Sequence, residues 1–206
     1  MIYLIGGSPR GGKSILARRL SKQLGISYIS TDNLRPVILP YFPKKEQASA
    51  FPFEQMFAPD NREEFFKNYT GREMLKADIK EAKVIWPGVK GLIEYLILCR
   101  MDYIIEGFHL LPSLVHKFKN KNKLKIVYLI KQDEEKILKG FLKNTNNEDW
   151  IASYIDDKDI LRKAAKAMSF YEVYFERECK KYKFKMINTE DDFQNSLKNI
   201  IKLLIK

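Results

Sequence analysis

The chain has 206 residues, of which 45% are hydrophobic and 31% charged, a composition typical of one globular domain and not of a disordered chain. No apolar run reaches the length of a membrane-spanning helix, and the first residues form no charged leader, so we expect a cytoplasmic protein without a membrane partner. The formal net charge of +11 suits either nucleic acid or a polyanionic substrate as a partner.

A phosphate-binding motif lies between the first predicted strand and the first predicted helix. The strand is the apolar run 2–5, and residues 7–14 follow it with the pattern G-x-x-x-x-G-K-[ST]. Leucines at every fourth position from Leu16 to Leu24 then predict an amphipathic helix. In this motif backbone N–H groups point at phosphates, the lysine reaches the terminal phosphates and the serine ligates Mg²⁺. The residues expected to bind ATP are Gly7, Ser8, Pro9, Arg10, Gly11, Gly12, Lys13, Ser14 and Ile15.

The second predicted strand, 27–30, is followed by an aspartate and an arginine. Asp32 and Arg35 come at the end of this strand, near the loop that would hold the nucleotide. In a phosphotransferase such an aspartate accepts the proton of the attacking hydroxyl, and such an arginine binds an anionic group of the acceptor. The alternative is that Asp32 caps a following helix.

The segment 35–100 is too long to be a loop. Prolines interrupt its first half, and apolar residues at helical spacing predict helices in 63–83 and 89–98. We expect a helical insertion that covers the site and binds the acceptor substrate.

An acidic residue ends the third predicted strand, 103–105. Glu106 occupies a Walker B-like position and could hold Mg²⁺ through its water shell. The alternative is that Glu106 caps the next turn. For His109, a satisfied or exposed imidazole is favoured over a catalytic one, because His116 is the only other histidine of the chain.

Two polar stretches lie beyond the third strand. The lysine-rich segment 117–125 favours a solvated turn, with nucleic-acid binding as the alternative. The polar stretch 144–149 lies within a possible lid, 139–160, with a plain surface loop as the alternative. Phosphoryl transfer needs positive charge on the migrating group, and this lid contains no arginine. Arg162 is therefore the first candidate for this catalytic role, and Arg10 is the second.

The remaining elements continue an alternation of strands and helices. A strand is predicted for 125–130, a helix for 157–182, a strand for 184–187 and a helix for 190–206. Such alternation implies a parallel sheet with helices on both faces, whose ligands bind at the carboxyl ends of the strands. We therefore expect residues 1–206 to form a single α/β domain.

The motifs resemble those of the P-loop small-molecule kinases, above all the 2-phosphoglycerate kinase-like proteins. The TD-x-x-R and EG-x-H-x-x-P segments of that group are matched here by residues 31–35 and 106–112. The layout is more distantly similar to adenylate kinase, and chloramphenicol phosphotransferase and the zeta toxins place an aspartate base at the position of Asp32. The resemblance implies a three-layer P-loop NTPase fold, with a five-stranded parallel sheet flanked by helices, and ATP and Mg²⁺ as cofactors.

These observations predict an ATP-dependent phosphotransferase that moves the γ-phosphate to a small, anionic metabolite or nucleotide. Lys13 would stabilise the transferred phosphate, Asp32 would act as base, Arg35 would hold the acceptor, and Ser14 and Glu106 would bind Mg²⁺. The alternatives are an NTP-hydrolysing switch or nucleic-acid-associated ATPase, and a zeta-toxin-like nucleotide-sugar kinase. We expect a monomer or a homodimer, and nucleic acid is not favoured as a partner.

Overall fold

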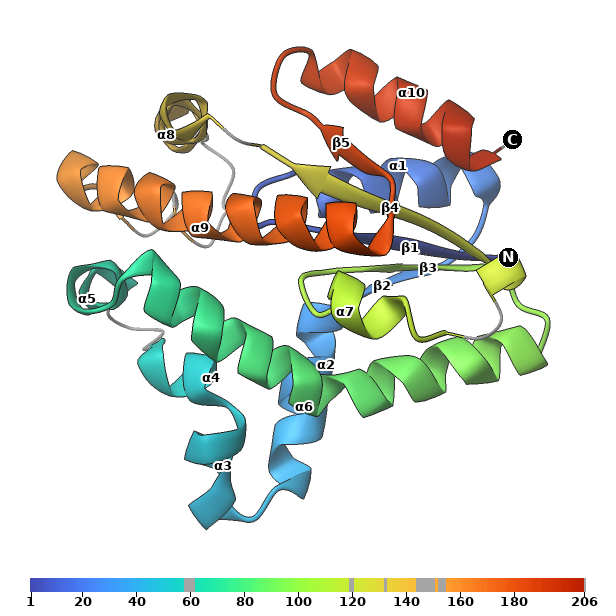
Figure 1. Ribbon diagram of the computed structural model, residues 1–206, viewed down its shortest axis with the longest axis horizontal. Helices are drawn as coiled ribbons and strands as arrows, with labels where there is room; N and C mark the ends of the chain where they lie inside the picture. Colours follow the sequence, from blue (N-terminus) through green and yellow to red (C-terminus); the bar gives the residue numbers. More distant parts are fainter. Residues whose placement is uncertain (58–61, 119–120, 132, 144–150, 152–154, 206) are drawn as a thin grey trace.

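A parallel sheet of five strands forms the centre of the molecule (Figure 1). The computed structural model describes residues 1–205 except 58–61, 119–120, 132, 144–150 and 152–154. The strand order is β2-β3-β1-β4-β5, and every neighbouring pair is parallel. The strands are β1 (Ile2–Gly7), β2 (Tyr28–Ser30), β3 (Tyr103–Glu106), β4 (Leu124–Ile130) and β5 (Met186–Asn188). Each of the five predicted strands is confirmed within about two residues.

The sheet changes its winding direction at β1, which lies between β3 and β4. The chain first runs from β1 to the edge strand β2, and only later reaches β4 on the other side. The crevice at such a switch point, beyond the carboxyl ends of the strands, is where α/β sheets bind ligands. The predicted phosphate loop begins at this point, directly after β1.

Two helices cover one face of the sheet. They are α1 (Lys13–Leu24) and α10 (Phe193–Ile205). Leu16 and Leu20 of α1 and Leu197 of α10 are fully buried against strand residues such as Tyr3 and Ile5. α1 ends at a glycine, Gly25, with φ 67°.

The other face of the sheet is covered by α6 (Gly71–Leu98), α7 (Pro112–Val115) and α9 (Lys158–Tyr182), with α8 (Glu134–Lys143) packed beside α9 (Figure 1). Ile2 and Leu4 point to this face, whereas Tyr3 and Ile5 point to the other, as the alternation of side chains along a strand requires. The three-layer α/β fold with helices on both faces of a parallel sheet is therefore confirmed.

The segment 35–100 is helical, as predicted, but its helices differ from the prediction. It holds α2 (Leu34–Ile38), α3 (Lys44–Ala50), α4 (Pro52–Met56), α5 (Arg62–Asn68) and α6. The predicted helix over 63–83 is wrong because the chain breaks after Asn68, where Thr70 and Glu73 form a capping box that starts a new helix.

The predicted break between 83 and 89 is wrong as well. α6 is continuous through Pro87 to Leu98. A proline inside a helix removes one hydrogen bond, but Ile85 and Val89 on either side of Pro87 are fully buried, and their packing holds the helix together. In Figure 1, α2, α3 and α4 form an arm below the long rod of α6.

No helix of the described ranges is long and apolar enough to cross a membrane.

Candidate active site

The phosphate-binding motif forms a loop between the carboxyl end of β1 and the start of α1. Two of its glycines are required by the fold. Gly7 has φ 127°, and a Cβ atom there would collide with the backbone of Leu129. Gly12 has φ 92°, and its Cβ would meet the ring of Phe193. Because only glycine fits these positions, the backbone can curl as a phosphate cradle requires.

Lys13 folds back over this loop. Its Nζ donates a hydrogen bond to the carbonyl oxygen of Ser8 at 2.6 Å. Burial lowers the pKa of the Lys13 ammonium, while the carboxylates of Glu106 and Asp32 raise it. The ammonium therefore lies in a partly buried position within reach of acidic groups from two neighbouring strand ends.

Ser14 contacts the acid at the end of β3. The Ser14 Oγ donates a hydrogen bond to Glu106 Oε1 at 3.0 Å, and the Glu106 carboxylate also interacts with the hydroxyl of Ser30. Glu106 is 3% exposed, and burial raises the pKa of its carboxyl group. These contacts join the ends of β2 and β3 to the start of α1.

A hydroxyl beside a carboxylate fits Mg²⁺, which takes oxygen ligands and keeps several waters. Among the residues that the structure describes, no group of three or more His, Cys, Asp or Glu side chains could hold a metal by itself. A site with few protein ligands agrees with a metal whose other ligands come from nucleotide phosphates and water. Ser14 and Glu106 thus fit the predicted Mg²⁺ position.

Asp32 lies in a short turn, Thr31–Asn33, directly after β2. The cap of this turn is Ser30, whose Oγ accepts a hydrogen bond from the backbone N–H of Asp32 at 3.3 Å, and α2 has no side-chain cap. The alternative role of Asp32 as a helix cap is therefore not observed. Its carboxylate is 64% exposed, with Oδ1 at 3.4 Å from Nδ1 of His109.

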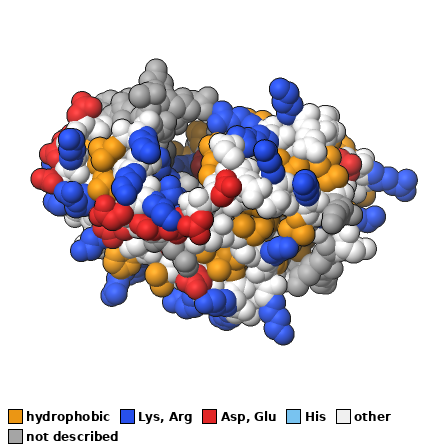
Figure 2. Space-filling model, turned by 90° about the horizontal axis from the view of Figure 1, so that it is seen from above, with side chains coloured by type: hydrophobic (Ala, Val, Ile, Leu, Met, Phe, Trp, Pro, Cys, Tyr) orange, Lys and Arg blue, Asp and Glu red, His pale blue; other side chains and the backbone are white. Residues whose placement is uncertain are grey.

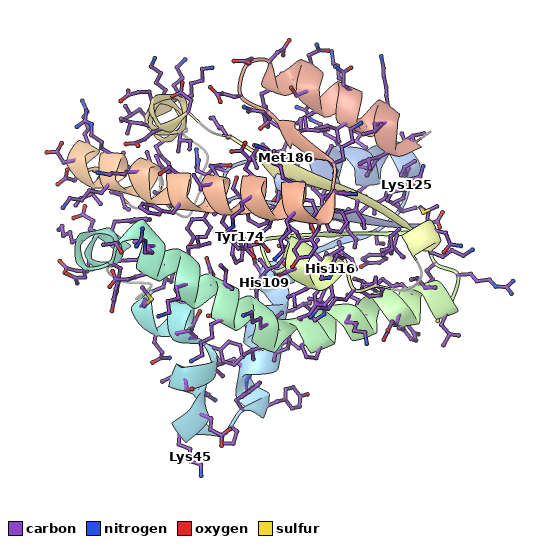
Figure 3. The ribbon with its side chains drawn as sticks, in the orientation of Figure 1. Lys45, His109, His116, Lys125, Tyr174 and Met186 are labelled. Carbon is purple, nitrogen blue, oxygen red and sulfur yellow. The ribbon has the colours of Figure 1, made fainter. Side chains whose placement is uncertain are left out.

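His109 is buried, with 1% of its surface exposed. Its Nδ1 lies 2.9 Å from Thr31 Oγ1, and burial lowers the pKa of the imidazole to about 4, so the ring is neutral near pH 7. Figure 3 shows His109 near the middle of the molecule, beneath the sheet. In the sequence, the only indication that His109 lies near the site is that it follows closely after a strand that ends in an acid, Glu106.

Arg35 of α2 contacts three carboxylates. Its Nε contacts Glu81 Oε1, its Nη1 lies 3.6 Å from Glu54 Oε2, and its Nη2 lies 3.7 Å from Asp78 Oδ1. These acids come from α4 and α6, and sequence reasoning did not single them out. The guanidinium that was predicted to bind an acceptor anion is thus already paired with groups of the protein.

Two of these acids occupy positions on the buried face of α6. Asp78 and Glu81 lie one turn apart among buried apolar residues such as Met74, Ala82 and Ile85. Tyr171 of α9 donates a hydrogen bond to Asp78 Oδ2 at 2.8 Å, and burial raises the pKa of Asp78 to about 8. Acids within an otherwise apolar helix face are the sequence signal that could have identified them.

Glu172 of α9 is a second acid that sequence reasoning missed. Ser8 of the phosphate loop donates a hydrogen bond to Glu172 Oε1 at 2.6 Å, and Glu172 is 2% exposed. Burial raises the pKa of Glu172 to about 8, against the opposing effects of Ser8 and Lys13. Glu172 lies between two buried aromatic residues, Tyr171 and Tyr174, and an acid on a buried helix face is the sequence signal that could have identified it.

The two predicted arginines lie in different places. The Cζ of Arg10 lies 4.3 Å from the ring centroid of Phe141 in α8, so this side chain connects the phosphate loop to a helix whose last residues belong to the predicted lid, 139–160. Arg162 is exposed on α9 and pairs with Asp159 at 3.0 Å. Of the two candidates, Arg10 is thus part of the phosphate loop, whereas the contact given for Arg162 is with a neighbouring residue of its own helix. Within the predicted lid, 139–160, residues 144–150 and 152–154 lie outside the described residues.

The last strand also contacts the loop. Thr189, one residue beyond β5, donates from its hydroxyl to the carbonyl oxygens of Gly11 at 3.0 Å and Ile130 at 3.2 Å. The hydroxyl thus connects the phosphate loop to the end of β4.

The lysine-rich segment 117–125, of which 119–120 lie outside the described residues, leads into β4 at the amino ends of the strands, opposite the phosphate loop. Lys125, on the right in Figure 3, donates to the carbonyl oxygen of Leu204 at 2.6 Å. Figure 2 shows Lys and Arg side chains spread over the molecule as seen from above, with a hollow between its left and right parts. The basic residues are therefore not confined to this segment.

The comparisons with known proteins agree with the sequence motifs. No protein-family model matches the chain. A 2-phosphoglycerate kinase from Methanocaldococcus jannaschii is 28% identical over 118 residues, which are 56% of this chain and 36% of that protein. A second, from Methanococcus vannielii, is 27% identical over 138 residues, which are 66% of this chain and 44% of that protein. The chain thus spans less than half the length of the curated relatives that it matches.

One solved structure supports the fold, and a second is reported for its coverage. An uncharacterised protein from Eubacterium ventriosum has 15% identity and a TM-score of 0.52, and the alignment covers 100% of this chain and 98% of that chain. Shikimate kinase from Aquifex aeolicus has 16% identity and a TM-score of 0.48, with coverage of 100% and 96%. Together with the loop geometry, the two sequence relatives confirm the predicted resemblance to P-loop small-molecule kinases.

Proposed function

We propose, from this resemblance to P-loop small-molecule kinases, that the chain transfers the γ-phosphate of ATP to a hydroxyl group of a small molecule. The observation that carries the proposal is the position of Asp32 and Glu106, whose carboxylates lie at neighbouring strand ends within electrostatic reach of Lys13. A switch needs the nucleotide loop alone, whereas a kinase also needs a carboxylate for the acceptor hydroxyl.

The nucleotide half of the proposed site consists of the residues 7–15. Their backbone N–H groups would bind the phosphates, and Lys13 would exchange its hydrogen bond with Ser8 for contacts to the β- and γ-phosphates. Ser14 would bind Mg²⁺ directly and Glu106 would do so through water. When bound, the metal neutralises charge on the transferred phosphate.

Asp32 is the proposed base. Its exposed carboxylate can accept the proton of the acceptor hydroxyl, while the buried His109 beside it limits the positions the carboxylate can take. Arg10 stays the better placed of the two arginines proposed for charge stabilisation, since it already belongs to the loop. Arg162 would need movement of its helix or of the segment before it.

The helical region 35–100 is proposed to bind the acceptor, and 139–160 to close over the site, all within one domain. The relatives are named for 2-phosphoglycerate, which makes this compound the first acceptor to test. Nucleotides and sugar nucleotides test the zeta-toxin-like alternative. Hydrolysis of ATP that no acceptor stimulates would point to the switch or nucleic-acid-associated ATPase.

The proposal is tested by ADP release from Mg²⁺-ATP with panels of phosphorylated metabolites, polyols, nucleotides and sugar nucleotides, followed by product masses. We expect one acceptor class to gain a phosphoryl group, and Lys13→Ala to lower kcat at least about 100-fold. Lys22→Ala, on the exposed surface of the same helix, is the control and should keep full activity. Full transfer by Lys13→Ala would exclude the phosphate loop from catalysis.

A further inference from the structure

The acceptor half of the proposed site contains more acids than bases. Arg35, Glu54, Asp78 and Glu81, which we call the Arg35 cluster, combine three carboxylates with one guanidinium. In the ion pairs of the described residues, all three acids pair with the same cation, Arg35. Burial raises the pKa of Asp78 to about 8, yet the other two carboxylates still outnumber the guanidinium when Asp78 is protonated.

The cluster adjoins the catalytic groups. Arg35 lies three residues after Asp32, in the helix α2 that directly follows the turn of Asp32, and the charge of Asp32 acts on Arg35 and on Asp78. Charges influence one another in this way only at short range in a screened medium. A molecule whose hydroxyl lies between Asp32 and the transferred phosphate therefore extends toward the cluster.

Part of the cluster can be reached by a ligand. The side chains of Arg35, Asp78 and Glu54 are 19%, 10% and 35% exposed, whereas Glu81 is fully buried. Glu81 thus pairs with Arg35 on the buried side of the cluster. The part of the cluster that solvent can reach consists of the guanidinium of Arg35 and the carboxylates of Glu54 and Asp78.

A second observation points to a ligand here. Nε2 of His109 has no hydrogen-bond partner among the described residues, although the ring is 1% exposed. The other nitrogen of the ring faces Thr31 and Asp32. Arg35 and Lys13 both lower the pKa of His109, so the ring lies within reach of the cluster and the phosphate loop. A buried polar atom of this kind is stabilised when a ligand supplies the missing hydrogen bond.

We propose that the acceptor is an uncharged or positively charged hydroxyl compound, a polyol or an amino alcohol, and not a phosphorylated or carboxylated one. Hydroxyl and ammonium groups donate hydrogen bonds to Asp78 and Glu54 without displacing them from Arg35. A phosphate would have to break those ion pairs and lie against acidic groups. The inference rests on the proposed phosphotransferase function and opposes an anionic acceptor such as 2-phosphoglycerate.

The test uses acceptors of similar size that differ in charge. One series is 2-phosphoglycerate, glycerate, glycerol and serinol, and another is glucose 6-phosphate, glucose and glucosamine. ADP release and product mass are measured with the full chain and Mg²⁺-ATP. We expect kcat/KM for the uncharged or amino members to exceed that for the anionic members by about 10-fold or more.

Two variants connect this preference to the cluster. Glu54→Gln and Asp78→Asn keep the shape of the side chains, and the asparagine can still accept from Tyr171. Glu54→Gln should shift the ratio of kcat/KM values about 10-fold toward the anionic members. Asp78→Asn should shift the ratio less, because burial already keeps the Asp78 carboxyl group mostly protonated near pH 7. Glu94→Gln, at an exposed ion pair with Lys90 on the same helix, is the control and should leave the ratio unchanged. Thermal unfolding of each variant shows whether it folds.

The outcomes separate the inference from the proposed function. Transfer to a polyol or amino alcohol in preference to its anionic counterparts, with the shift in Glu54→Gln, supports the inference. Lys13-dependent transfer to an anionic member in preference to all others overturns the inference and leaves the kinase function standing. Lys13-dependent ATP hydrolysis with no transfer to any member overturns both.

Discussion

The phosphate loop takes its functional groups from consecutive residues, 7–14, whereas the proposed acceptor region takes them from α2, α4, α6, α9 and the loop after β3. The loop needs backbone N–H groups in a particular curl, and glycines at two positions determine that curl locally. The acceptor region needs side-chain charges in a particular arrangement, and these meet only after the helices have packed. A function can therefore be read from the first region, but the acceptor only from the second.

The largest effect is expected where the two regions meet. Asp32→Asn should lower kcat by about 10²–10⁴-fold with little change in ATP affinity, because the amide cannot accept the hydroxyl proton and no loop contact is lost. Single-turnover rates and titration with an ATP analogue measure the two quantities. Equal losses in both would mean that Asp32 supports the loop and is not the base.

The stability of the acceptor region depends on Arg35. Arg35→Met should lower the free energy of unfolding by about 3 kcal/mol, because Glu81 is fully buried and would lose its cation. Lys90→Met, which removes an exposed pair with Glu94, should cost less than about 1 kcal/mol. Urea unfolding measures both changes. The double variant Arg35→Met with Glu81→Gln should regain part of the loss, and no recovery would contradict the role of the pair.

The phosphate loop can be altered without touching the acceptor region. Gly12→Ala should weaken ATP binding about 10-fold or more, because the new methyl group meets Phe193 at a residue with φ 92°. Gly91→Ala, in α6 with open space around it, is the matched control and should leave binding intact. Isothermal titration with an ATP analogue and Mg²⁺ measures the affinity of both variants. Unchanged affinity in Gly12→Ala would show that the loop can adjust to the added methyl group.

The pH dependence of stability tests Glu172, which connects α9 to the loop. Its pKa of about 8 lies above the ordinary value of 4.5, so between these pH values the folded chain keeps a proton that the unfolded chain has released. Stability therefore falls as the pH rises through this window. The variant Glu172→Gln has no carboxyl group to titrate in this window, so its unfolding free energy relative to the unaltered chain should rise by about 4 kcal/mol from pH 4.5 to 8.

The control for this prediction is the exposed Glu94→Gln, whose difference from the unaltered chain should not change across the same pH range. Urea unfolding at several pH values provides the comparison. A constant difference for Glu172→Gln would mean that the carboxyl group titrates near its ordinary pKa.

Local patterns allowed all five strands and the helices α1, α9 and α10 to be predicted. The helices between 35 and 100 were predicted less well, because the break at Thr70 depends on a side-chain cap and the continuity through Pro87 depends on packing with other elements. The prediction for Arg35 had the same weakness. Its sequence context suggests an anion clamp, and the acids that pair with it lie on helices whose positions the sequence pattern does not specify.

The sequence alone determined the phosphate loop, the parallel α/β architecture and the presence of acids at the ends of β2 and β3, since each depends on neighbouring residues or on the alternation of apolar runs. Only the tertiary structure showed His109 beside Asp32, Glu172 beneath the loop and three carboxylates around Arg35. The physical reason is that burial and electrostatic pairing are properties of distances between segments remote in sequence. Those distances are fixed by how α6 and α9 pack on the sheet.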